Sequence, residues 1–542
     1  MRMRIAGALF AAVTLLALTG GIDAQAPQAG IQPQVDKLFA RWTASTPGCA
    51  VGADVAGKPV VRSVYGTADL EHDVPITLDT VFEVGSVSKQ FTAAAVLLLA
   101  GDGKLSLDDV VRKYIPEMPD VAANVTIRQM LNHTAGLRDW GVLAAIQGWP
   151  RTTRVHTHAH VLDLVSRQRM LNFEPGTRWS YSNTGYNLAA ILVGRVSGMS
   201  FPDFTRTRIF EPLDMTSTSW RDDYTRVVKR RAMAYDEQKG VFSTLMPFEN
   251  VYGNGGLLTT VGDLLKWNAN FEKPVVGDAR FVEEMQRRTR FKDGREHEYA
   301  LGLYVDTYRG RREVDHSGGT AGYIAHLSRY PDHGVSVAVM CNVRTGNATN
   351  AAKAIADLLL PAGGVAGSKP SYVLTSNEGA ALTGLYRSLK PVGTITISLQ
   401  KDQLVSSTAG VLSGGPTKFE SGGDLAFVFD GRGGLKVTDE FGTTDTLERV
   451  QAWKPGLQDL KPIVGRYASD ELQMTVAVAL EGDRLVIQRG PQGSIALTPI
   501  FPDGFSSGLG WIVARRDGSG RITAFSVNQE RVWDLRFARL PD

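Results

Sequence analysis

The run Ser86-Val87-Ser88-Lys89 places a hydroxyl and an amine three positions apart. Residues three apart lie on one face of a helix, so a helix that begins here holds the Lys89 amine near the Ser86 oxygen. A serine hydroxyl becomes a good nucleophile only when a base takes its proton. The following residues are apolar as far as Ala100, and burial disfavours a charged ammonium. We therefore predict that Ser86 is a nucleophile and Lys89 its base.

The same spacing occurs elsewhere, so spacing alone does not identify a nucleophile. Ser398-Leu399-Gln400-Lys401 follows an alternating strand pattern, and we predict that this copy is structural. The run Gly504-Phe505-Ser506-Ser507-Gly508 matches the elbow that presents a serine between a strand and a helix, but no helical pattern follows it. Of these serines, Ser86 is the one that a helical pattern follows in the sequence.

Two further motifs follow Ser86 in the chain, Tyr181-Ser182-Asn183 and His316-Ser317-Gly318. Each has a structural explanation when taken singly. Tyr181 is compatible with a core aromatic, Asn183 with a helix cap and His316 with a surface histidine. In this order behind a Ser-x-x-Lys motif, they indicate a phenol, an amide and an imidazole gathered around one serine.

The three motifs resemble those of the serine β-lactamases, the penicillin-binding DD-peptidases and their relatives. The resemblance is strongest to the branch of class C β-lactamases and D-aminopeptidases, whose second motif is Tyr-x-Asn and whose third is Lys-Thr-Gly or His-x-Gly. The stretches 131–137 and 253–257 are also similar to this family. The resemblance covers roughly residues 35–360.

The resemblance implies the catalytic roles. Ser86 attacks the carbonyl carbon of the substrate and becomes acylated. Lys89 and the phenol of Tyr181 share the work of the general base, and Tyr181 returns a proton to the leaving group.

The resemblance also implies the substrate-binding residues. Asn183 donates to an amide carbonyl of the substrate, and His316, with Gly318 after it, lies near the carboxylate or the leaving group of the substrate. The backbone N–H groups of Ser86 and Gly319 form the oxyanion hole. Candidates for the acyl pocket are Trp140, Tyr252 and Tyr323, because they flank the motifs.

Histidine at position 316 bears on the reaction. A lysine there attracts a substrate carboxylate through a fixed positive charge, whereas histidine is largely neutral near pH 7. We therefore expect a peptidase for short peptides with D- or non-standard residues, like the D-aminopeptidases or the peptidases that cleave linearised microcystin. The alternatives are an esterase or β-lactamase of the same fold, and an acyl-trapping sensor or binding protein without turnover.

The elements around these motifs indicate an α/β sandwich. Residues 49–65 form a hairpin pattern, 86–100 a buried helix capped by Ser86 or Ser88, and 320–330 and 334–343 a strand pair that begins just after His316. A helix is expected over about 349–360. Strands near both ends with helices between them predict an antiparallel sheet flanked by helices, as in the β-lactamase-like transpeptidase fold.

A repeat follows a small, glycine-rich linker at 363–371. Gly384-Leu385-Tyr386-Arg387-Ser388 recurs as Gly465-Arg466-Tyr467-Ala468-Ser469, and further short strand patterns recur at the same offset. We predict a hydrolase domain over 30–362 and two small all-β, barrel-like domains over 372–452 and 453–542.

The N-terminus has the pattern of a secretory signal peptide over 1–24, with Arg2 and Arg4 before an apolar run and Ala24 at the cleavage point. We expect an exported, periplasmic or secreted bacterial protein with no stable membrane span after cleavage; an uncleaved anchor is the alternative. The net charge of +3 argues against a nucleic-acid partner. The expected partner is a small peptide or ester substrate, and the oligomeric state stays open.

The cysteines and the histidine cluster are the remaining candidates for special chemistry. Cys49 and Cys341 are either a disulfide or two buried thiols. The run His156-Thr157-His158-Ala159-His160 suggests a metal, but further ligands are missing nearby, and Thr157 makes a good helix cap. We expect no cofactor and no metal.

Overall fold

A computed structural model of the protein describes residues 30–151, 153–362, 374–390, 392–421, 425–439, 442–490 and 493–541. The predicted signal peptide and linker lie outside these residues. We call residues 30–362 the N-terminal domain. None of the described helices is both long and apolar enough to cross a membrane.

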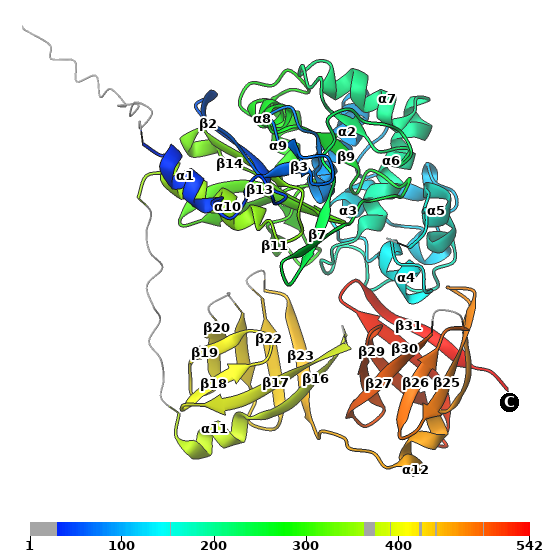
Figure 1. Ribbon diagram of the computed structural model, residues 1–542. Coiled ribbons are helices and arrows are strands. Elements are labelled where there is room, and N and C mark those ends of the chain that lie inside the picture. The colour runs from blue at the N-terminus through cyan, green and yellow to red at the C-terminus, as the bar shows by residue number, and fades with distance from the viewer. Residues whose placement is uncertain are drawn as a thin grey trace, which may run out of the picture.

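The N-terminal domain is built on a six-stranded antiparallel sheet in the order β12-β13-β14-β15-β1-β2 (Figure 1). Its strands are β1 (Cys49–Val55), β2 (Lys58–Tyr65), β12 (Tyr304–Tyr308), β13 (Arg311–Thr320), β14 (Tyr323–Tyr330) and β15 (Val335–Cys341). The pairing of β1 with β15 joins the two ends of the domain, as predicted. The expected antiparallel sheet flanked by helices is confirmed.

Both faces of this sheet are buried, because β1 and β15 carry apolar residues at successive positions. Val51, Val337 and Val339 pack in one cluster with α1 (Gln32–Leu38) and α10 (Ala348–Leu359). Ala338 and Met340 face the other cluster, with α2 (Ser88–Gly101) and α8 (Val261–Ala269). The remaining α-helices of the domain are α3 (Ile127–Leu131), α4 (Trp140–Ile146), α5 (His158–Ser166), α6 (Asn183–Ser197), α7 (Phe201–Thr205) and α9 (Ala279–Met285).

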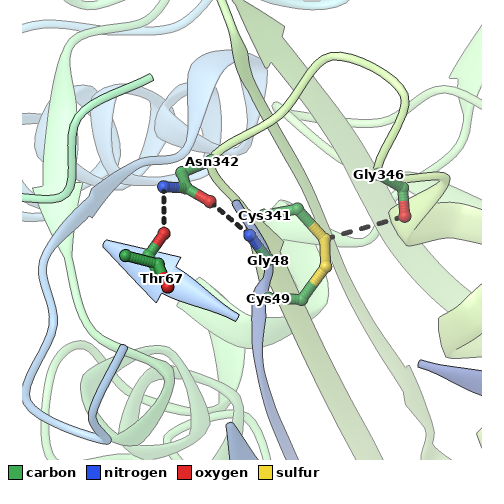
Figure 2. The surroundings of a disulfide bond; sticks show 6 residues. All are labelled: Gly48, Cys49, Thr67, Cys341, Asn342 and Gly346. Atoms are coloured by element: carbon green, nitrogen blue, oxygen red, sulfur yellow. Dashed lines mark hydrogen bonds between the residues drawn. A yellow bond between two sulfur atoms is a disulfide. The ribbon is translucent and has the colours of Figure 1, made fainter. Parts of the chain in front are cut away.

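A disulfide links Cys49 at the start of β1 to Cys341 at the end of β15 (Figure 2). The two residues are direct partners in the strand register. Next to them, the side chain of Asn342 accepts a hydrogen bond from the N–H of Gly48 at 2.8 Å and donates to the carbonyl of Thr67 at 3.0 Å. Of the two alternatives for the cysteines, the disulfide is the one present.

Two local predictions are wrong. The helix α2 starts at Ser88, and neither Ser86 nor Ser88 caps it; the Ser88 hydroxyl instead donates to the carbonyl of Gly85 at 2.6 Å. The motif His316-Ser317-Gly318 lies inside β13 rather than just before a strand. Glycines and a serine lower the strand signal of this segment, but pairing with β14 fixes it as a strand.

The two predicted β units are closed, eight-stranded barrels. The first barrel consists of β16 (Gly384–Leu389), β17 (Val392–Gln400), β18 (Gln403–Ser406), β19 (Gly410–Gly414), β20 (Lys418–Ser421), β21 (Ala426–Phe429), β22 (Gly434–Thr438) and β23 (Thr444–Val450). The second barrel consists of β24 (Gly465–Ser469), β25 (Met474–Glu481), β26 (Arg484–Gln488), β27 (Ser494–Phe501), β28 (Gly504–Ser507), β29 (Gly510–Arg516), β30 (Ile522–Gln529) and β31 (Val532–Arg539).

The sequence repeat has a counterpart in the contacts of the barrels. The buried Tyr386 donates its hydroxyl hydrogen bond to the carbonyl of Leu382, and Tyr467 does the same to Ile463, each four residues earlier in the chain. Ser398 and Ser506, the serines of the two other motif matches, lie in strands β17 and β28 of the barrels.

Both barrels lie on the same side of the N-terminal domain (Figure 1), and each makes side-chain hydrogen bonds to it. The second barrel makes the more buried contact: Arg138, which is fully buried, donates to Glu471 at 2.5 Å and to the carbonyl of Trp533 at 2.7 Å. The first barrel contributes Asp445, which pairs with the partly exposed Arg178.

Candidate active site

Ser86 lies in a single turn of 3-10 helix, Gly85–Val87, directly before α2. Gly85 has φ +50°, and a Cβ there would lie 2.5 Å from the backbone nitrogen of Gly319. A Cβ at Gly318 would lie 2.0 Å from the carbonyl oxygen of Val84 and 3.0 Å from the nitrogen of Ser86. Glycines therefore allow β13 to run against the Ser86 turn, and both backbone N–H groups predicted for the oxyanion hole lie at this contact.

Lys89 lies one turn further along and is fully buried. Its Nζ donates to Ser86 Oγ at 3.1 Å, to Asn183 Oδ1 at 3.0 Å and to the carbonyl of Asn254 at 2.7 Å. Burial, and then the positive charges of Arg151 and Arg531, hold the pKa of Lys89 well below its usual value. An amine that loses its proton here has its lone pair within reach of the serine hydroxyl.

Tyr181 lies against the same amine, with its ring centroid 4.8 Å from Lys89 Nζ. Burial raises the pKa of the phenol, although a hydrogen bond with Ser86 and the charge of Arg531 act in the opposite direction. The phenol therefore keeps its proton near pH 7 and is suited to donate it.

Asn183 is the first residue of α6, so it is not the helix cap; that position belongs to Ser182. Its side-chain oxygen accepts from Lys89, which leaves the amide NH₂ as a donor. Its backbone N–H donates to Asp139 Oδ2 at 2.7 Å.

His316 is 2 % exposed, so the interpretation as a surface histidine is wrong. Its Nε2 lies 3.3 Å from the hydroxyl of Tyr299, and its Nδ1 lies 2.5 Å from the carbonyl of Ser317. Its ring centroid is 6.3 Å from that of Tyr181. Burial, and then the charge of Lys89, lower the pKa of His316 to about 3, so this imidazole is neutral at physiological pH.

Three residues with no predicted role join the site. Asn254 supplies the carbonyl that holds Lys89. His133 packs on Tyr181 with ring centroids 4.4 Å apart, and Tyr299 contacts both His133 and His316. Asn254 and His133 lie in the two family-like stretches singled out above, so the sequence did carry a signal for them, but Tyr299 lies in no motif.

A fourth residue reaches the site from the second barrel. Arg531 lies in the turn between β30 and β31, and its guanidinium carbon is 4.7 Å from the ring centroid of Tyr181. No motif surrounds this arginine, and nothing in the sequence indicated its position.

The histidine cluster is occupied by local contacts. The Nε2 atoms of His156 and His158 each lie 3.0 Å from a backbone carbonyl, that of Trp149 and that of Tyr252. His160 Nδ1 accepts from the N–H of Thr157 at 3.1 Å, in the capping box that starts α5.

The three aromatic candidates for the acyl pocket differ in burial and in partners. Trp140 is fully buried and donates to Asn187, and Tyr323 is fully buried and donates to the carbonyl of Ala232. Tyr252 is partly buried against Phe201. None of the three lines the cavity beside Gly319.

Two cavities flank the site. One of about 340 Å³ lies beside Gly319 and is lined by Arg151, Pro247, Glu249, Gly319, Thr320, Ala321, Ile324 and Arg344. The other, of about 240 Å³, lies beside Tyr181, and residues of both barrels complete its wall. Both barrels thus contribute residues to the wall of the cavity beside Tyr181.

Residues 35–361 match the family model described as "Beta-lactamase". The chain is 25 % identical over 507 residues to a D-aminopeptidase from Brucella anthropi, covering 89 % of this chain and 93 % of that protein. It is 28 % identical over 305 residues to penicillin-binding protein 4* from Bacillus subtilis, covering 51 % and 64 % of the two chains. The octameric penicillin-binding protein homologue from Pyrococcus abyssi has a similar fold, with a TM-score of 0.54, 20 % identity and 84 % and 97 % of the chains covered.

Proposed function

Because the chain belongs to the beta-lactamase family and is a serine hydrolase, we propose that it is an exported peptidase that acts on short peptides with D- or non-standard residues through an acyl-enzyme at Ser86. The observation that carries this proposal is the contact of 3.1 Å between Lys89 Nζ and Ser86 Oγ, in a setting where the lysine is fully buried. It is the arrangement that a serine needs to become a nucleophile.

In the proposed mechanism the neutral amine of Lys89 takes the proton from Ser86 Oγ, which attacks the substrate carbonyl. The N–H groups of Ser86 and Gly319 stabilise the oxyanion. Tyr181 gives its proton to the leaving nitrogen and regains one from the Lys89 ammonium. Water then attacks the acyl-enzyme, and the same groups return Ser86 to its starting state.

Two observations favour a peptidase over a β-lactamase. The imidazole of His316 is neutral where a lysine would carry a fixed charge. The similarity to the D-aminopeptidase also runs through most of the chain, barrels included. An esterase of the same fold is the second candidate, because nothing in the acylation step requires an amide.

Export is supported by the disulfide between Cys49 and Cys341, because such bonds persist mainly in oxidising compartments. It agrees with the signal-peptide pattern of residues 1–24.

The test is turnover of D- and L-aminoacyl amides, short esters and a chromogenic cephalosporin. We expect repeated hydrolysis of a D-aminoacyl amide, and its loss in Ser86→Ala. Ser398→Ala and Ser506→Ala are matched controls that keep full activity, because both serines lie in barrel strands.

A stoichiometric burst followed by a stable acyl-protein would contradict the peptidase and favour the acyl-trapping alternative. Full activity in Ser86→Ala would overturn the site itself.

A further inference from the structure

The guanidinium of Arg531 lies beside the active site, and no carboxylate of the described residues is within hydrogen-bond distance of it. Among the described residues, the carboxylate oxygen nearest to it belongs to Glu530, at 3.9 Å from Arg531 Nε, and that side chain is 82 % exposed. This separation exceeds a hydrogen bond. The five N–H donors of an arginine form a fork that matches a carboxylate.

The turn that contains Arg531 is hydrogen-bonded to the N-terminal domain. The carbonyl of Arg531 accepts from the N–H of Asp139 at 3.2 Å and from the side chain of Asn172 at 3.1 Å. Asn172 in turn accepts from the N–H of Trp533 at 2.8 Å. Asp139 also holds the backbone of Asn183, so one residue positions both the arginine turn and the Tyr181-Ser182-Asn183 motif.

Three other basic side chains near Tyr181 are paired with a carboxylate or are neutral. Arg151 pairs with Glu249, Arg178 pairs with Asp445, and His316 is uncharged. The nearby cavity also has the carboxylates of Asp439 and Glu530 in its wall. Among the described residues, two basic side chains lie over the ring of Tyr181: the Lys89 amine, which is neutral in the proposed mechanism, and the Arg531 guanidinium.

We propose that Arg531 binds a carboxylate on the leaving-group side of the scissile bond, so that the preferred substrates are short peptides with a free C-terminus. This inference rests on the proposed function, in which Tyr181 protonates the leaving nitrogen. The carboxylate carbon of a C-terminal residue lies two bonds from that nitrogen. A leaving nitrogen at Tyr181 therefore brings this carboxylate close to Arg531, which packs on the Tyr181 ring. The second barrel thus supplies the positive charge that the third motif lacks.

The test measures binding without turnover. The probes are D-phenylalanyl-D-alanine and its C-terminal amide, which differ only in the carboxylate, titrated calorimetrically into Ser86→Ala protein at about pH 7, where a C-terminal carboxyl is ionised. We expect the acid to bind roughly 10- to 100-fold more tightly than the amide, as a charge-assisted hydrogen bond would allow. Ser86→Ala/Arg531→Gln should lose this difference, and Ser86→Ala/Arg531→Glu should reverse it.

The matched control is Ser86→Ala/Arg536→Gln, which removes an exposed arginine of the same hairpin that pairs with Asp534. It should keep the preference for the acid. Equal binding of the two probes, binding of neither, or a preference that survives Arg531→Gln overturns the proposal. Because turnover plays no part here, failure of the hydrolase itself would appear separately, in the Ser86 comparison.

Discussion

At the scale of single residues, the site depends on groups whose protonation is set by burial. Lys89 and His316 both have lowered pKa values, so both favour their neutral forms, whereas Tyr181 has a raised pKa and favours its protonated form. The sequence indicated only that Lys89 and Tyr181 share the general-base work. The opposite directions of their pKa shifts suit Lys89 to accept a proton and Tyr181 to donate one.

The pH dependence of activity should follow Lys89. A protonated lysine cannot take the serine proton, so kcat/KM is expected to rise with pH through an inflection well below the ordinary lysine value. Lys89→Arg should reduce kcat/KM by about 10²–10⁴-fold, because a guanidinium stays charged. The measurement is a pH profile of ester hydrolysis.

Lys401→Arg, in the second Ser-x-x-Lys motif at 398–401, should leave this profile unchanged. An inflection near pH 6.5 that disappears in His316→Asn would contradict the assignment, because it would mean that His316 titrates there.

At the scale of elements, the sequence predicted what depends on neighbours in the chain. Ser86 and Lys89 are joined by one helical turn, and Tyr386 and Tyr467 mark the barrel repeat. It failed for β13, whose strand state comes from pairing with β14. It also failed for Tyr299, which reaches the site only through the fold.

The disulfide between β1 and β15 is the element whose loss should be measurable. It closes a loop with a sequence separation of 292 residues, and native disulfides typically contribute about 2–5 kcal/mol. Cys49→Ala/Cys341→Ala is expected to lower the urea midpoint of the N-terminal domain. A reducing agent should destabilise the wild type and leave this variant unaffected; equal sensitivity in both would contradict the prediction.

At the scale of the whole molecule, the second barrel is tied to the N-terminal domain through a buried ion pair. Arg138 is fully buried, and Glu471 accepts both from it and from the N–H of Arg169 at 3.0 Å. The contact of the first barrel, between Arg178 and Asp445, is more exposed. Such long-range pairs could not be predicted from the sequence, because no pattern links positions so far apart.

The two ion pairs should therefore differ in their contributions to stability. Glu471→Gln leaves the Arg138 charge buried without a carboxylate, and we expect a loss of about 3–5 kcal/mol. Asp445→Asn should cost about 1 kcal/mol or less. Calorimetric unfolding of both variants checks this, and similar losses would show that the buried pair does not dominate the interface.

The contact between Arg531 and Tyr181 also has a consequence for the timing of biosynthesis. A chain made from its N-terminus acquires Ser86 and Tyr181 long before Arg531, and the second barrel closes only when β31 pairs with β24. Until β31 is made, a growing chain contains Ser86 and Tyr181 but not the complete barrel that holds Arg531 beside them. On the proposal above, binding of a substrate carboxylate therefore depends on a turn held by the last strands of the second barrel, although Ser86 and Tyr181 lie in the N-terminal domain.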